Sequence, residues 1–192
     1  MMTSLDQAFK KMERKNFLHE NSIVDAQLDT PLPIGFGQTN SQPSTVYMML
    51  EWLEPESGDK VLDVGSGSGW TSALLSNLVG AKGKVFSVER IGELVEFGQQ
   101  NCDRMGIRNV KFYLAGKEFG LAKYAPYNKI LVSASCDKLP KSLLAQMKIG
   151  GKMVIPVGNN ILEVTKLSDS KIDTITHPGF IFVPLLKGAD SA

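Results

Sequence analysis

Cysteine and histidine are scarce in this chain of 192 residues, which contains two of each. Cys102 and Cys136 lack the spacing of a metal site or a disulfide framework, so we expect two reduced thiols and no bound metal. His19 and His177 fall in no motif that resembles a zinc site or a Ser-His-Asp triad. The chemistry of this protein is therefore expected to work without histidine.

Long apolar runs and a large net charge are also absent. No apolar stretch approaches the ~20 residues that span a bilayer, and charged residues stand where a signal peptide needs its apolar core. The net charge is +1, and the one basic cluster is short, as is typical of a solvated helix face: Lys10, Lys11, Arg14 and Lys15. We expect one structural domain in the cytoplasm, with neither a membrane nor a nucleic acid as partner.

Short apolar runs alternate with segments of helical period, which is the pattern of parallel strands joined by helices. Helices are predicted over 71–79, 91–106 and 141–151. Together with the strands, they predict an α/β fold with a doubly wound, mostly parallel, seven-stranded sheet whose ligand lies over the carboxyl ends of the strands. The predicted strands are 61–64, 85–88, 110–114, 130–133, 153–156, 161–167 and 180–184.

The first part of the chain differs from the rest, and we expect 1–55 to form an arm that packs on a core over 56–192. The arm begins with a basic, helix-like segment and ends with a helix over 45–53. Between them, DTPLPIGFGQTNSQP (29–43) has three prolines and two glycines, which predict no regular structure. An ordered loop of this length is more often functional than decorative.

The most informative motif is VLDVGSGSGW (61–70), in which an apolar strand runs into glycines at alternate positions. Glycines allow a sharp turn and a close approach of the backbone to a ligand. The third glycine, Gly69, comes one position earlier than in a dinucleotide fingerprint, so the motif argues against NAD. A glycine turn without a ligand is the alternative reading.

An acid in the next strand favours the ligand reading. Glu89 ends the apolar run VFSVE (85–89), where a carboxylate can accept hydrogen bonds from both ribose hydroxyls of S-adenosyl-L-methionine. Asp63, two residues before Gly65, is expected to face the amino-acid part of that cofactor, directly or through water. The two motifs together predict a methyltransferase.

Several motifs in order make the chain resemble the protein-L-isoaspartate O-methyltransferases from about Phe17 to Gly188. PLPIGFGQTNSQP (31–43) is similar to the family's substrate loop, P-L-P-I-G-x-G-Q-T-I-S-x-P, and VLDVGSGSGW is similar to its cofactor loop. The resemblance implies a class I, Rossmann-like methyltransferase fold. The other similar segments are VFSVER (85–90), APYNKILVSAS (125–135), GGKMVIPVG (150–158) and FVPL (182–185).

The resemblance implies methyl transfer from S-adenosyl-L-methionine to the free carboxylate of L-isoaspartyl residues in damaged proteins or peptides. Such a carboxylate is ionised at neutral pH, so the reaction needs no general base. The family's active-site serine falls on Ser41, for which the alternative is a turn hydroxyl that bonds its own backbone. The implied site has Ser41 and Thr39 as catalytic residues, Ile34, Gly37, Gln38 and Asn40 as substrate-binding residues, and Asp63, Gly65, Ser66, Gly67, Gly69, Glu89, Arg90 and Gly116 as cofactor-binding residues.

Two departures from the family pattern affect this site. Ala115, Gly116 and Lys117 stand where the family has Gly-Asp-Gly, whose aspartate contacts the adenine amino group. Losing such a hydrogen bond costs on the order of 1.5–3 kcal/mol unless Glu118 replaces it. Asn40 stands where the family has an apolar residue beside the serine, and this change can alter substrate choice.

These departures leave two alternatives open. A catalytically impaired family member would act as a cofactor-binding or peptide-binding module, and robust turnover would exclude it. A methyltransferase with a different substrate would share the cofactor motif alone, and the near-neutral charge disfavours RNA as that substrate.

Overall fold

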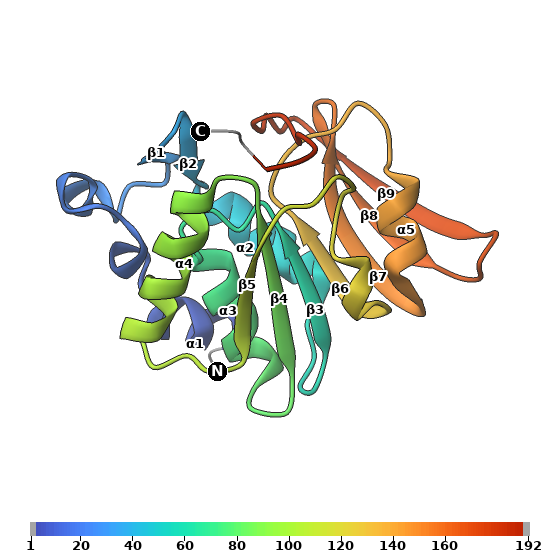
Figure 1. The fold of residues 1–192 in the computed structure, drawn as a ribbon, viewed down its shortest axis with the longest axis horizontal. Coiled ribbons are helices and arrows are strands. Elements are labelled where there is room, and N and C mark those ends of the chain that lie inside the picture. The colour runs from blue at the N-terminus through green and yellow to red at the C-terminus, as the bar shows by residue number, and fades with distance from the viewer. Residues whose placement is uncertain (1–2, 190–192) are drawn as a thin grey trace.

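The computed structural model describes residues 3–189 of the chain. Its main sheet has the strand order β5-β4-β3-β6-β7-β8-β9, and Figure 1 shows helices on both of its faces. β3 to β7 run parallel, whereas β8 and β9 are antiparallel additions at one edge. The predicted doubly wound, mostly parallel, seven-stranded sheet is therefore confirmed. The strands are β3 Lys60–Val64, β4 Lys84–Glu89, β5 Val110–Leu114, β6 Tyr127–Val132, β7 Met147–Val157, β8 Asn160–Lys166 and β9 Ile172–Pro178.

The central strands are buried on both faces because their side chains alternate between two hydrophobic clusters. Val61 of β3 packs with residues of α1 to α4. Its neighbour Leu62 points to the opposite face, where it packs with Leu143 of α5. None of the helices in residues 3–189 is long and apolar enough to cross a membrane. The α-helices are α1 Ser4–Lys11, α2 Pro43–Leu53, α3 Trp70–Val79, α4 Gly92–Arg104 and α5 Lys141–Gln146, and the short 3-10 helices are η1 Arg14–Phe17, η2 Glu20–Asp25 and η3 Ala122–Tyr124.

The helix predicted over 141–151 is wrong in its second half. α5 ends at Gln146, and Met147 begins β7, where it pairs with Tyr127 of β6. Two glycines explain the early end. Gly150 has φ +79°, and a Cβ on Gly151 would lie 2.8 Å from the carbonyl oxygen of Asn128. Neither residue suits a helix interior, and the second allows β6 and β7 to approach closely.

The strand predicted over 180–184 is also wrong. The last strand is β9, whose sequence IDTITHP is mostly polar and exposed because it lies at the edge of the sheet. Gly179, with φ +96°, turns the chain out of β9. The apolar run that follows makes a single bridge, Pro184 to Ser135, and otherwise lies outside the sheet.

The expectation that 29–43 has no regular structure is wrong as well. β1 Leu32–Gly35 and β2 Gln38–Asn40 form an antiparallel hairpin with Leu32 opposite Asn40. Phe36 and Gly37 connect the strands with φ values of +55° and +68°, as in the mirror-image turn that suits hairpins. A two-stranded hairpin leaves each strand an outer edge, where proline is tolerated.

The strand order fixes where a ligand site is expected. The chain proceeds outward from β3 to β4 and β5 in one direction, and then from β6 to β7 in the other. The carboxyl ends of β3 and β6 therefore flank a topological switch point. The hairpin follows η2, which it contacts, and leads into α2, so the N-terminal part of the chain reaches this edge of the sheet.

Candidate active site

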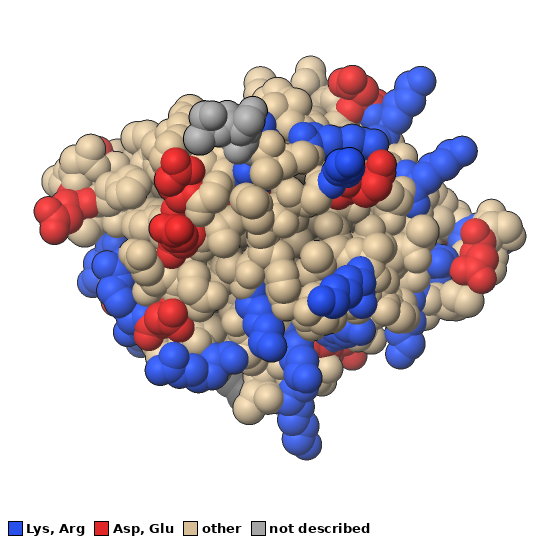
Figure 2. Space-filling view, in the orientation of Figure 1, with Lys and Arg blue, Asp and Glu red and all other residues tan. Residues whose placement is uncertain are grey.

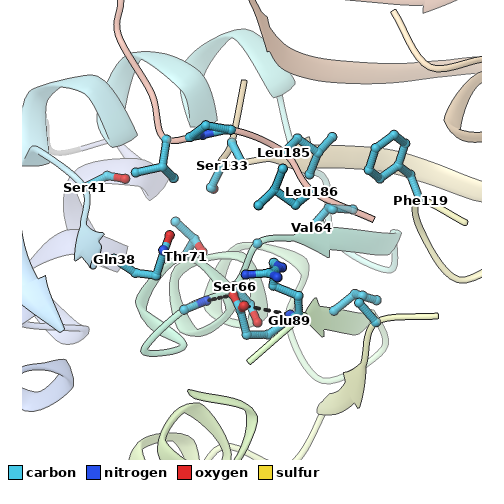
Figure 3. Close-up of a pocket in the computed structure, with 18 of the residues that line it drawn as sticks. Gln38, Ser41, Val64, Ser66, Thr71, Glu89, Phe119, Ser133, Leu185 and Leu186 are labelled. Atoms are coloured by element: carbon cyan, nitrogen blue, oxygen red, sulfur yellow. Dashed lines mark hydrogen bonds between the residues drawn. The ribbon is translucent and has the colours of Figure 1, made fainter. Parts of the chain in front are cut away.

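A cavity opens at the switch point (Figure 3). Its empty volume is about 870 Å³, open space at the mouth included. Several parts of the chain line it. They are the β1–β2 hairpin with Ser41, the glycine loop (65–69) with the start of α3, the segments at the ends of β4, β5 and β6, and the C-terminal wall (183–188).

The glycine loop turns sharply and also packs closely against two other elements. Gly65, with φ +77°, lines the cavity, and its N–H donates to the carbonyl oxygen of Val88 at 2.8 Å. A Cβ on Gly67 would lie 3.0 Å from Cδ1 of Ile34 in the hairpin. A Cβ on Gly69 would lie 3.0 Å from the carbonyl oxygen of Gly98 in α4. Gly69 is not among the lining residues, so it serves helix packing.

Glu89 lies at the end of β4 with its carboxylate on the cavity, and only 6% of the residue is exposed. Oε2 accepts a hydrogen bond from the Gly67 N–H at 3.0 Å. Oε1 accepts from the N–H groups of Arg90 at 2.7 Å and Ile91 at 3.1 Å. A carboxylate has about four acceptor positions, so the remaining capacity is on Oε2. Arg90 lines the cavity beside it.

Ser66 and Asp63 have different positions relative to the cavity. Ser66 lines it, and its Oγ is buried without a hydrogen-bond partner among residues 3–189. A buried hydroxyl without a partner is a group that a ligand can satisfy. Asp63 is fully buried and lies behind the lining, where Oδ2 accepts from Thr71 Oγ1 at 2.8 Å and from Ser72 Oγ at 2.6 Å. Burial raises the pKa of Asp63 to about 6.

The hairpin forms the opposite side of the cavity. Ile34, Gln38, Thr39, Asn40 and Ser41 line it, whereas Gly37 lies in the turn outside the lining. Figure 3 shows Ser41 and Gln38 on one side, facing Leu185 and Leu186 of the C-terminal wall. Within the described residues, the Ser41 hydroxyl has no hydrogen-bond partner, so the alternative of a turn hydroxyl bonded to its own backbone is not what the structure contains.

Arg14 is a structural residue of the site, and its assignment to a solvated helix face is wrong. It is 5% exposed, and its guanidinium donates five hydrogen bonds to the segment from Leu28 to Ser41. Desolvation lowers its pKa to about 10, partly offset by Asp29, so it stays charged at neutral pH. The sequence does not indicate this role, because one of four basic residues between positions 10 and 15 gives no sign of burial.

The segment after β5 carries the departure from the family's Gly-Asp-Gly. Ala115 and Gly116 line the cavity, whereas Lys117 does not. Glu118 does line it, and its Oε2 accepts from Lys187 Nζ of the C-terminal wall at 3.1 Å. The Gly188 N–H donates to the Gly116 carbonyl at 3.1 Å. Sequence reasoning missed this contact between two chain segments, although FVPL (182–185) marked the start of the wall.

Neither histidine lines the cavity. In the part of the chain that the structure describes, no group of three or more His, Cys, Asp or Glu side chains is placed to hold a metal ion. Both cysteines are free, Cys102 buried in α4 and Cys136 half-buried after β6. The groups that the cavity offers to a ligand are hydroxyls, amides, backbone groups, carboxylates and the basic side chains of Arg90 and Lys187.

A parallel sheet with a glycine loop after its first parallel strand, and an acid at the end of the next, is the arrangement of a Rossmann-like cofactor-binding fold. The solved structures that match it have the class I methyltransferase fold. The family model described as protein-L-isoaspartate(D-aspartate) O-methyltransferase matches residues 2–190. The chain belongs to this family, which confirms the resemblance seen in its motifs.

Relatives of known family and solved structures agree with this assignment. Proteins named protein-L-isoaspartate O-methyltransferase from Fervidobacterium nodosum and Pyrococcus horikoshii are each 43% identical to the chain. The match to the first covers 91% of this chain and 90% of that protein. The match to the second covers 95% of this chain and 84% of that protein. A solved protein-L-isoaspartate O-methyltransferase is 28% identical with a TM-score of 0.88, over 96% of this chain and 61% of that one. A Plasmodium falciparum structure in complex with S-adenosyl-L-homocysteine has a TM-score of 0.86 over 97% of this chain and 91% of that one, and at 24% identity it shows the shared fold.

Proposed function

We propose that this chain is an enzyme that transfers a methyl group from S-adenosyl-L-methionine to the free carboxylate of L-isoaspartyl residues in damaged proteins or peptides. One observation carries the proposal. The hairpin that ends at Ser41 and the glycine loop with Glu89 face each other across a single cavity. A methyl donor held on one side and a carboxylate held on the other can therefore meet within it.

The residues present suit the cofactor. Glu89 keeps acceptor capacity on Oε2 for a ribose hydroxyl, and the Ser66 hydroxyl needs a partner. On the cofactor side of the cavity, the backbone comes close to the ligand at Gly65, Gly67 and Gly116. Arg90 lines the same side. Asp63 orients Thr71, which lines the cavity and whose hydroxyl donates a hydrogen bond to the Asp63 carboxylate. When bound, S-adenosylmethionine supplies an activated methyl group next to a positive sulfur.

The substrate carboxylate needs positioning more than activation. Its pKa is near 4, so it is ionised at neutral pH and the protein has no proton to remove. Ser41 Oγ, which has no other partner among the described residues, donates a hydrogen bond that orients the carboxylate, with Thr39 as a second hydroxyl. Gln38 and the hairpin backbone contact the isoaspartyl peptide. Leu185 and Leu186 add apolar surface to the cavity lining.

Glu118 takes the place of the aspartate that the family has in its Gly-Asp-Gly segment. It is the acid in the cavity lining that lies nearest in sequence to the altered positions. Its side chain is 70% exposed, and its pair with Lys187 is therefore weak enough to leave a carboxylate oxygen for the adenine amino group. A Glu118→Gln variant is expected to weaken binding of S-adenosylhomocysteine severalfold in calorimetry, whereas Lys187→Met leaves it within about twofold.

Isoaspartyl-containing proteins are the expected partners, in the cytoplasm, without a nucleic acid or a membrane. The charge of the molecule supports this proposal. The net charge is +1, and on the face drawn in Figure 2 the basic side chains are scattered over the edges and the lower middle, with acidic ones among them. Such a surface does not form the continuous basic field that a polyanion requires. Fractionation of cells that express the chain would test the location.

The deciding experiment is transfer of a radiolabelled methyl group from S-adenosylmethionine to a short isoaspartyl peptide, beside the same peptide with normal aspartate. We expect label on the isoaspartyl peptide alone. Label on neither peptide, from folded protein that binds S-adenosylhomocysteine, would favour a binding module without activity. Equal label on both would favour a different substrate.

A further inference from the structure

Asn40 connects the two sides of the cavity. It ends β2, next to Ser41, and is 5% exposed. Its amide nitrogen Nδ2 donates to Ser68 Oγ of the glycine loop at 3.0 Å. Its amide oxygen Oδ1 accepts from Arg14 Nε at 2.8 Å. The buried amide of Asn40 is thus hydrogen-bonded through both of its polar atoms. Its nitrogen bonds the glycine loop, and its oxygen bonds Arg14, which holds the hairpin.

The Arg14 end of this bridge fixes where Ser41 lies. Nη2 of Arg14 donates to the backbone oxygens of Asn40 at 2.9 Å and of Ser41 at 3.0 Å. These bonds hold the backbone of the proposed catalytic serine. An apolar side chain at position 40 would leave Arg14 Nε without this acceptor in a buried place, which is unfavourable for a charged donor.

The Ser68 end belongs to the loop that contacts the cofactor. The Ser68 carbonyl accepts from Asn101 Nδ2 of α4 at 2.9 Å, and the adjacent Gly67 N–H donates to Glu89. Ile34 also touches the loop, since its Cδ1 lies 3.0 Å from where a Gly67 Cβ would be. The loop and the hairpin are therefore in direct contact through Asn40 and Ile34, so that a displacement of either one would act on the other.

We propose that Asn40 is a positioning residue that couples the two binding events, so that a ligand on the glycine loop strengthens binding of the isoaspartyl peptide through the Asn40–Ser68 hydrogen bond. The proposal rests on the proposed function. Coupling of this kind is reciprocal, so it is measured from either ligand. One hydrogen bond carries about a three- to tenfold effect on a dissociation constant.

The test measures a coupling factor by calorimetry. It is the Kd of an isoaspartyl hexapeptide without S-adenosylhomocysteine, divided by its Kd with S-adenosylhomocysteine at saturation. We expect a factor of about five or more for the wild type, and a factor that is at least about threefold smaller and approaches one for Ser68→Ala and for Asn40→Ala. The coupling factor of the double variant should be no lower than that of either single variant, because both substitutions remove the same contact.

Two further variants separate coupling from general stability. Asn40→Asp keeps an acceptor for Arg14 and accepts from the Ser68 hydroxyl, so it should retain the wild-type factor within about twofold. Ser76→Ala removes a buried serine hydroxyl on α3 that bonds Asn109, away from the cavity. It should lower the melting temperature and leave the factor unchanged.

Two results would overturn the proposal. Ser68→Ala and Asn40→Ala that lose stability but keep the wild-type coupling factor would show that the bridge is only structural. A wild-type protein that methylates the peptide with a coupling factor of one would reject the coupling and keep the proposed function. A wild-type protein that binds S-adenosylhomocysteine but no isoaspartyl peptide would reject the function itself.

Discussion

Replacing Arg14 tests most severely whether a buried cation holds the substrate hairpin in place. In Arg14→Met, two buried acceptors lose their donor, the side-chain oxygen and the backbone oxygen of Asn40. Each costs about 1–3 kcal/mol when left unsatisfied. The carbonyls of Leu28, Thr30 and Ser41 are only partly buried and can bond to water instead. We therefore expect a loss of about 4 kcal/mol, a large share of the ~5–15 kcal/mol of a typical domain.

The assay for Arg14→Met is urea unfolding followed by tryptophan fluorescence, because the guanidinium lies 5.6 Å from the Trp70 ring centre. Lys15→Met is the matched control. Lys15 is next in sequence, and its ion pair with Glu13 is half exposed, so this variant should lose less than about 0.5 kcal/mol. A free energy of unfolding for Arg14→Met within about 0.5 kcal/mol of the control would refute the reasoning.

Three other predictions concern the cavity and the strand below it. Ser41→Ala should lower kcat/KM for an isoaspartyl peptide about 10- to 100-fold while the Kd of S-adenosylhomocysteine stays within twofold; equal activity would remove the assigned role. Glu89→Ala should weaken S-adenosylhomocysteine binding about 10-fold or more, with Glu163→Gln as a buried control that keeps the wild-type Kd; an unchanged Kd would exclude the ribose contact. Burial raises the pKa of Asp63 to about 6, above its unfolded value near 3.8, so this residue destabilises the fold as pH rises through that window. The free energy of unfolding of the wild type relative to Asp63→Asn should therefore fall by about 2 kcal/mol from pH 4 to pH 7 in urea titrations, and a constant difference would contradict the shift.

The local parts of the site follow from the sequence. A glycine loop after an apolar strand, and an acid at the end of the next, occupy fixed places in a parallel sheet, so Gly65 and Glu89 could be placed on the same edge without coordinates. Apolar runs of four to six residues likewise located the buried parallel strands. The polar edge strand β9 gave no such signal, because a strand with its side chains exposed needs no apolar pattern.

Contacts between distant segments could not be predicted from the sequence. Arg14, Asn40 and Ser68 form one hydrogen-bonded bridge across 54 residues, and nothing in their separate segments indicates that they contact one another. Asn40 in particular reads as a departure from the family, yet its amide is fully used once Arg14 and Ser68 are beside it. The C-terminal wall is a further case, since its contact with Gly116 depends on how the chain leaves β9.

The most direct test of the central claim, that one cavity holds donor and acceptor on its two sides, is a crystal structure with S-adenosylhomocysteine and an isoaspartyl peptide bound together. We predict a ribose hydroxyl on Glu89 Oε2 and the isoaspartyl carboxylate within hydrogen-bond distance of Ser41 Oγ, pointing toward the sulfur. A peptide bound away from the hairpin, or a cofactor that leaves Glu89 and the glycine loop untouched, would contradict it.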